Sequence, residues 1–150
     1  MAQGHTGWGK RVMDLAQTFS PTYALARLRF LESAAAVGLK IESHLHPLKG
    51  RDGEALAMDV ALAGNADAAG MLVISSGCHA VAGYCGSGVR VYALHDAMWI
   101  ESAARADVAP LYLHALNPYG FSHIRRVTHE NLDLNRNFGD YDQPLPVNQA

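Results

Sequence analysis

The feature of this sequence that most constrains its fold is an apolar run that ends in a glycine-rich loop. The run GMLVI at 70–74 leads into SSGCHAVAGYCGSG at 75–88, and VAPLYLHALN at 108–117 forms a second apolar run. Short apolar runs of this kind are typical of parallel strands buried on both faces. A helical pattern over 88–106 separates them. The order strand, helix, strand predicts a right-handed crossover between neighbouring parallel strands.

Further elements precede this unit. Ser20 and Pro21 have the order of an N-cap and a first helical residue, and Gly38 supplies a C-terminal stop. Between them, apolar residues recur at helical spacing: Leu25, Leu28, Leu31 and Ala35. The stretches at 40–48 and 55–64 flank the turn-forming KGRDGE, which predicts two strands joined as a hairpin.

Composition narrows the class of protein. The 150 residues are enough for one domain, and 49% hydrophobic with 17% charged residues is typical of a globular chain. A net charge of −2 gives no electrostatic reason to expect a nucleic acid or a membrane as partner. We expect an extension at 1–19, an α/β domain at 20–140 and a loose tail at 141–150.

The cellular setting is also predicted from composition. The N-terminal MAQGHTGWGK lacks the apolar core of a signal peptide, and no apolar run is long enough to cross a bilayer. Cys78 and Cys85 do not form a CxxC pair, so free thiols in a reducing compartment are the simpler interpretation, although a disulfide stays open. We therefore expect a cytoplasmic protein.

Two groups of residues are candidates for chemistry. His79 follows the apolar run at 70–74, where the loops of parallel sheets bind ligands. The segment 131–138 alternates polar with other residues, which predicts an extended stretch with one amide- and carboxylate-bearing face. It does not fit a calcium loop, because Phe138 and Pro144 stand at the expected glycine and glutamate positions. A turn-capping histidine and a plain polar loop are the alternatives.

In their order, SSGCHAVAGYCGSG, NPYGF at 117–121 and RRVTHENLDLNRNF at 125–138 resemble zinc carboxypeptidases of the carboxypeptidase A type. They are most similar to an uncharacterised bacterial branch whose loop reads approximately S-S-G-T-H-G-V-E-G-F. The resemblance runs from Tyr23 to Phe138 and covers the N-terminal half of that domain. It implies a three-layer α/β/α fold with a mixed, partly parallel sheet, in a truncated version.

The resemblance also implies roles for individual residues. His79 would be the first zinc ligand, and Arg126 would polarise a scissile carbonyl and stabilise the oxyanion. Asn135 and Arg136 would grip the terminal carboxylate of a peptide or amide, for which a guanidinium fork is well suited. Zinc with three protein ligands would lower the pKa of bound water to about 7.

The departures from the pattern bear on activity. Ala82 stands where the family has its second ligand, a glutamate, and a methyl group cannot bind zinc. Cys78, Ala80 and Thr128 replace a threonine, a glycine and an asparagine of the branch. The family's third ligand and general-base glutamate would lie beyond residue 150. A zinc site rebuilt with Cys78 or Cys85 is a further alternative.

Three hypotheses follow from these observations. The chain is a catalytically incompetent pseudoenzyme that keeps the carboxylate grip. Alternatively, it is a zinc-dependent hydrolase whose missing groups come from another chain, or it is an interaction domain that uses an open sheet edge. Because the family's sheet would end at an apolar strand here, we expect self-association through that edge.

Overall fold

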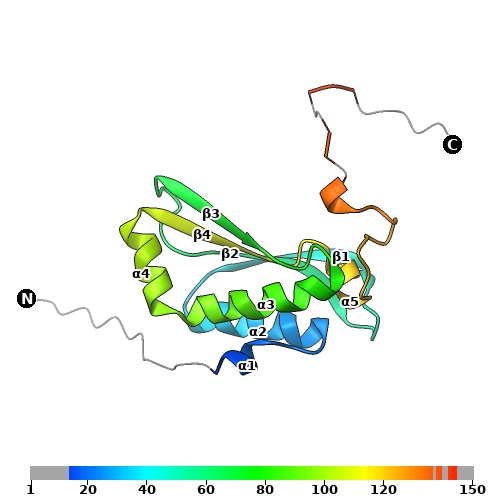
Figure 1. Cartoon of the computed structure of the whole chain (residues 1–150), viewed down its shortest axis with the longest axis horizontal. Coiled ribbons are helices and arrows are strands. Elements are labelled where there is room, and N and C mark those ends of the chain that lie inside the picture. Colours follow the sequence, from blue (N-terminus) through cyan, green and yellow to red (C-terminus); the bar gives the residue numbers. More distant parts are fainter. Residues whose placement is uncertain (1–13, 137, 140–141, 145–150) are drawn as a thin grey trace, which may run out of the picture.

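A four-stranded mixed sheet organises the chain, with strand order β1-β2-β4-β3 (Figure 1). The computed structural model describes residues 14–136, 138–139 and 142–144. β1 pairs with β2 and β2 with β4 in antiparallel fashion, whereas β3 and β4 are parallel. The strands are β1 (Ile41–Lys49), β2 (Ala55–Leu62), β3 (Gly70–Ser75) and β4 (Val108–His114). The predicted hairpin and parallel crossover are both confirmed.

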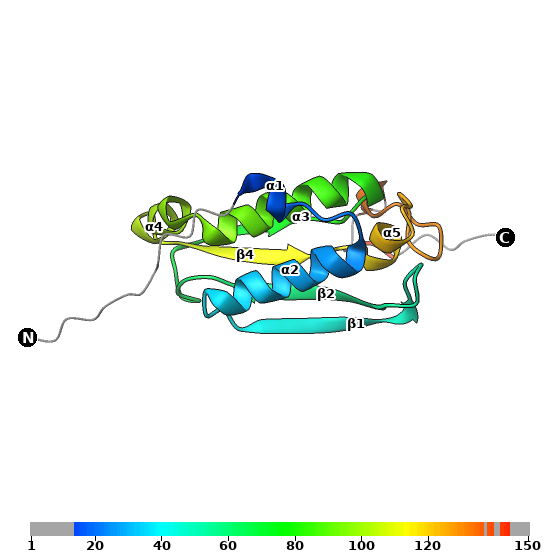
Figure 2. The ribbon, with the colours of Figure 1, turned by 90° about the horizontal axis from the view of Figure 1, so that it is seen from below.

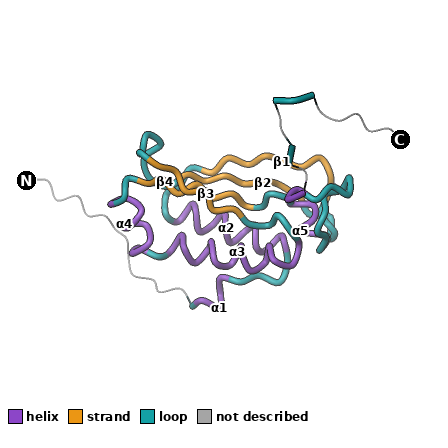
Figure 3. The backbone as a smooth tube through the Cα atoms, turned by 45° about the horizontal axis from the view of Figure 1, so that its top comes forward, coloured by secondary structure: helices purple, strands orange, loops and turns teal. Residues whose placement is uncertain are grey.

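Two long helices lie side by side across one face of this sheet (Figure 2). They are α2 (Tyr23–Ala36) and α3 (Ala80–His95). The shorter helices are α1 (Leu15–Thr18), α4 (Ala97–Arg105), α5 (Pro118–Ser122) and the 3-10 turn η1 (Leu134–Arg136). The expected α/β class with a mixed sheet is confirmed. In residues 14–136 the long helices form one layer, on one face of the sheet (Figure 3).

The core lies between these helices and the sheet. Its main cluster joins residues of α2, α3, β2 and β4, all fully or almost fully buried: Phe30, Ala34, Ala61, Val91, Leu94 and Tyr112. Arg27 of α2 reaches the buried carboxylate of Asp59 on β2, with an N···O distance of 2.7 Å. Burial of apolar area drives this packing, and the ion pair fixes where α2 lies on the sheet.

The structure corrects three local predictions. The helix expected from Ser20 is capped by Thr22, whose side chain accepts from the Leu25 N–H. The single helix expected over 88–106 is broken at Asp96, which caps α4 by accepting from the Met98 and Trp99 N–H groups. A side chain that satisfies these donors competes with continued helix, and periodicity alone does not detect that.

The third correction concerns β3, which is not buried on both faces. Met71, Leu72 and Val73 are 55%, 43% and 52% exposed. β3 lies at the outer edge of the sheet, and α3 covers it only in part (Figure 1). A continuous apolar run indicates that a strand prefers burial, but it does not say whether neighbouring chain is present to bury it.

Part of the predicted N-terminal extension is packed against the domain, since α1 contacts α3 and Thr18 is buried. Residues 1–13 of the extension, and residues 141 and 145–150 of the expected tail, lie outside the described residues. Among the described helices, none has the length and apolar character needed to cross a membrane.

The parallel pair positions the candidate site. Beyond the carboxyl ends of β3 and β4, the two segments that follow these strands stay joined by backbone hydrogen bonds. These run from Leu116 N–H to Ser76 O (3.0 Å) and from Asn117 N–H to Gly77 O (2.9 Å). These bonds continue the ladder for two residues. They bring the loop at 76–79 and the loop that leads to α5 to one end of the sheet, as the strand order predicts.

Candidate functional site

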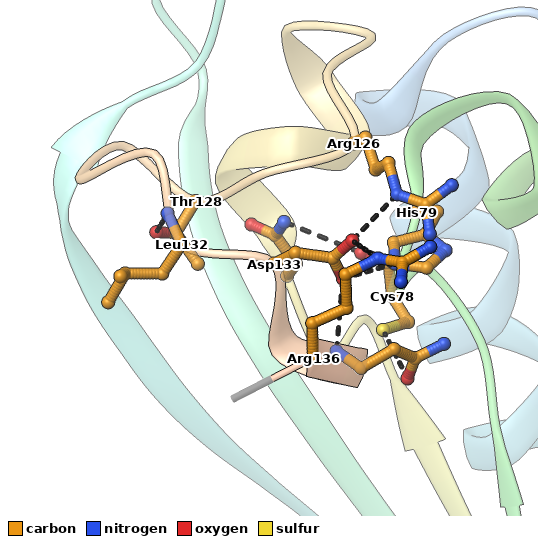
Figure 4. A network of polar contacts seen from close by, with 9 residues as sticks. Cys78, His79, Arg126, Thr128, Leu132, Asp133 and Arg136 are labelled. Atoms are coloured by element: carbon orange, nitrogen blue, oxygen red, sulfur yellow. Dashed lines mark hydrogen bonds and ion pairs between the residues drawn. The ribbon is translucent and has the colours of Figure 1, made fainter. Parts of the chain in front are cut away.

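Side chains from three segments meet at this end of the sheet (Figure 4). Cys78 and His79 come from the loop before α3, and Arg126 comes from the segment after α5. Asp133 directly precedes η1, and Arg136 is its last residue. Asp133 is their common partner. The loop with Cys78 and His79 is more than forty residues from the other two segments in the sequence. The parallel pairing of β3 and β4 brings that loop to them.

His79 and Asp133 form the central contact. Nε2 of His79 lies 3.0 Å from Oδ1 of Asp133. Because an ionised carboxylate only accepts hydrogen bonds, the histidine donates from Nε2, and in its neutral form Nδ1 then carries the lone pair. A carboxylate that fixes the tautomer of a histidine in this way is common behind metal-ligating imidazoles.

Asp133 also holds two arginines. Its Oδ2 accepts from Nε of Arg126 at 2.7 Å, and Nε of Arg136 lies 3.4 Å from the same oxygen. The hydrogen bond from Arg126, followed by the one from His79, holds the pKa of the Asp133 carboxyl well below its usual value. Asp133 is therefore ionised at neutral pH.

The arginines present their outer edges to solvent. The side chains of Arg126 and Arg136 are 56% and 75% exposed, whereas that of Asp133 is 13% exposed. Both guanidinium groups contact Asp133 through Nε, and within the described residues no hydrogen bond occupies their terminal nitrogens. Two guanidinium groups share one carboxylate, so the cluster retains a net positive charge and suits an anionic ligand.

Two amide side chains complete the site. The backbone N–H of Asn135 donates to Asp133. The side-chain Oδ1 of Asn135 lies 3.6 Å from Sγ of Cys78. Asn117 donates from Nδ2 to the Cys78 carbonyl at 3.4 Å and caps α5 by accepting from the Gly120 N–H. Asn117 thus connects the two loops. Its signal in the sequence is the Asn-Pro pair, an N-cap before a first-turn proline.

The lead-in to η1 corrects another prediction. The segment 131–138 is not extended over its described residues, because Asn131 has φ +63° and Leu134–Arg136 form a 3-10 turn. Thr128 closes the preceding turn, accepting from the Leu132 N–H through Oγ1 and donating its own N–H to the Leu132 carbonyl. This turn, rather than strand alternation, directs Asp133 and Asn135 toward His79. Asn137 lies outside the described residues.

The residues present do not fit a zinc ion. An open cleft of about 200 Å³ is lined by Cys78, His79 and Ala82, so Ala82 lies at the same cleft as His79. Ala82 offers no donor, and burial with the nearby Asp133 charge raises the pKa of the Cys78 thiol, which disfavours the thiolate. Cys85 is exposed on α3, and both thiols are free. Across the described residues, no three His, Cys, Asp or Glu side chains are grouped for a metal.

The structure places the residues that the sequence analysis singled out close to one another, and their roles stay predictions. His79, Arg126 and Arg136 converge as neighbours of one carboxylate, and Asn135 lies beside them. The residue that sequence reasoning underrated is Asp133, which was only one of several polar residues in the segment 131–138. Its spacing of two residues before Asn135 was visible, but its role as the common anchor was not.

Fold and site together define an α/β domain with a basic, carboxylate-anchored site at the carboxyl ends of two parallel strands. The chain belongs to the family described as "Protein of unknown function (DUF2817)", whose model matches residues 19–150. No curated protein matches it.

Among solved structures, the chain is similar to the crystal structure of Fimbriiglobus ruber glutaminyl cyclase. The TM-score is 0.42 and the identity 12%, over 66% of this chain. The match spans 40% of the cyclase chain.

Proposed function

We propose that this chain is a carboxypeptidase-like domain that binds the free carboxylate of a short peptide or amide and does not hydrolyse it as an isolated chain. The observation that carries the proposal is the anchoring of Arg126 and Arg136 on Asp133 through Nε. This anchoring leaves the outer nitrogens of each guanidinium directed to solvent. Asn135 adds an exposed amide donor beside them.

The chemistry of the cluster supports this ligand class. A carboxylate accepts paired hydrogen bonds from a guanidinium, and pre-anchoring reduces the side-chain entropy that binding would otherwise cost. Arg126 is the group that, by resemblance, would polarise a carbonyl. Polarisation of a carbonyl by itself does not activate water, and the described residues hold no group of three His, Cys, Asp or Glu side chains for a metal.

A pair of peptides tests this proposal. A short peptide with a free C-terminal carboxylate is expected to bind, and the same peptide with a C-terminal amide is not, as measured by calorimetry. Arg136→Gln should lower the affinity for the carboxylate peptide by about 10- to 100-fold, the range expected for charge-assisted hydrogen bonds. Arg105→Gln is the matched control, because Arg105 is equally exposed but pairs with Glu101 on α4. Equal affinity for the two peptides would contradict the proposal.

One observation favours a second candidate, a zinc-dependent hydrolase of carboxylate-ended peptides or amides that another chain completes. Asp133 fixes His79 with Nδ1 available, which is the preparation that a ligating histidine needs. The zinc content of the purified chain, measured by elemental mass spectrometry after dialysis against a weak chelator, separates the two candidates. We expect no zinc, and about one zinc per chain would favour the hydrolase.

A further inference from the structure

The outer edge of β3 is an edge of the sheet, with no further strand beside it among the described residues. The Gly70 N–H points to Asp107 O and the Ser76 N–H to Leu113 O, so even-numbered residues direct their backbone groups toward β4. Because these directions alternate along a strand, the N–H and C=O groups of Met71, Val73 and Ser75 point outward. Figures 1 and 3 show no described element beyond this edge.

The side chains of β3 carry no protection against pairing. The strand GMLVIS has no charge and no proline, and its three central side chains are about half exposed. Sheets usually guard such an edge with charges, proline or a bulge. β1, the opposite edge, has all three, since it contains Glu42, Pro47 and Lys49 and a register shift between Leu45 and Lys49.

The difference between the two edges decides which occupant fits. A β3 edge that met β1 of the next copy would build an open-ended filament, and the guarded β1 disfavours that contact. A β3 edge that meets another β3 gives a closed, two-fold dimer. Its uncharged sequence places no like charges opposite each other across the two-fold axis.

We infer that β3 pairs antiparallel with β3 of a second copy of this chain, forming a continuous eight-stranded sheet. A two-fold axis perpendicular to the sheet keeps the helices of both copies on one side, so opposed residues must share a face. A register centred on Leu72 meets this condition and sets Met71 opposite the partner's Val73. The hydrogen-bonded pairs then fall on Met71 and Val73, whose backbone groups point outward.

This register also buries the side chains that β3 leaves exposed. Met71 and Val73 lie on the helix-free face. Met71 of each copy would pack against Val73 of the other copy. Leu72 lies on the same face as Ile74, which packs against the core. Leu72, which is 43% exposed, would meet its own counterpart at the axis.

Sedimentation velocity over a concentration series tests the inference. The chain should pass from monomer to dimer, and Val73→Lys should abolish the dimer at every concentration sampled because it places a charge in the new pairing. Leu45→Lys is the control, since Leu45 is a 73% exposed residue on the opposite edge strand. A monomer at all concentrations, an open-ended series of larger species, or an unchanged dimer in Val73→Lys would overturn the inference.

A cross-link tests the register without introducing a charge. Non-hydrogen-bonded antiparallel partners have Cα atoms about 4.5 Å apart, within the range of a disulfide. In a background with Cys78→Ser and Cys85→Ser, Leu72→Cys should form a covalent dimer on mild oxidation, and Leu45→Cys should not. Failure of Leu72→Cys to cross-link, or equal cross-linking of both variants, would contradict the proposed pairing.

Discussion

At the scale of single residues, His114 is the clearest case of a side chain whose charge state is set by its surroundings. It ends β4, is fully buried, and stacks on Phe30 with ring centroids 5.4 Å apart. Burial first, and then the positive charges of Arg90 and Arg27, lower its pKa well below the ordinary value. Within the described residues neither ring nitrogen has a hydrogen-bond partner. His114 is therefore neutral in the folded protein.

This neutrality predicts a pH dependence of stability. The unfolded chain takes up a proton at His114 below a pH of about 6.5, and the folded protein does not. The free energy of unfolding should therefore fall as pH falls below 6.5, by about 1.4 kcal/mol per pH unit from this residue. His114→Gln should show a shallower slope between pH 6.5 and 5 in urea titrations. Identical slopes in the two proteins would show that His114 does not contribute.

At the scale of elements, close backbone approach at Gly77 joins the loop after β3 to α5. Gly77 has φ +68°, and a Cβ there would lie 2.5 Å from Cβ of Ala115 and 3.0 Å from the Phe121 ring. Gly83, in the first turn of α3, would place a Cβ 2.9 Å from Cα of Gly77. Helix, loop and α5 therefore meet with no room for side chains, and this contact positions Cys78 and His79.

Gly77→Ala should consequently destabilise the protein. Left-handed backbone strain and the clash with Ala115 should together lower the free energy of unfolding by about 2–4 kcal/mol, as measured by urea denaturation. Gly53→Ala is the matched control. Gly53 has φ +84° but no atom within 4 Å of a built Cβ, so only the strain of about 1–2 kcal/mol should appear. Equal losses in the two variants would exclude the close approach as the cause.

At the scale of the whole molecule, the sheet has one helix-covered face, one guarded edge and one open edge (Figures 1 and 2). Helices α2 and α3 bury the core from one side, whereas Met71 and Val73 stay exposed on the other. An assembly that pairs the open edge would bury apolar surface that the single chain leaves in water. Stability and assembly are then linked.

This linkage predicts a concentration-dependent midpoint of thermal unfolding. Because a second copy binds only the folded chain, raising the protein concentration should raise Tm, as measured by differential scanning calorimetry. Val73→Lys should remove the dependence while unfolding as cooperatively as the parent chain does at its lowest concentration. A Tm that does not change with concentration in the parent chain would count against the linkage.

The order and type of the main elements could be predicted from the amino-acid sequence, because each rests on local patterns. Apolar runs, helical spacing and turn residues predicted the hairpin, α2 and the parallel crossover of β3 and β4. Two helix boundaries were placed wrongly. The Ser20-Pro21 pattern began α2 too early, since Thr22 is its N-cap, and periodicity over 88–106 did not detect the cap at Asp96.

Which residues share the site, and which strand remains open, depends on the three-dimensional packing of the chain. Asp133 became the anchor of His79, Arg126 and Arg136 because a turn closed by Thr128 directs it across to the loop after β3. β3 looked like a buried strand, yet burial depends on which chain lies beside it, not on its own composition. Both outcomes rest on contacts between segments far apart in sequence, and no local pattern encodes those.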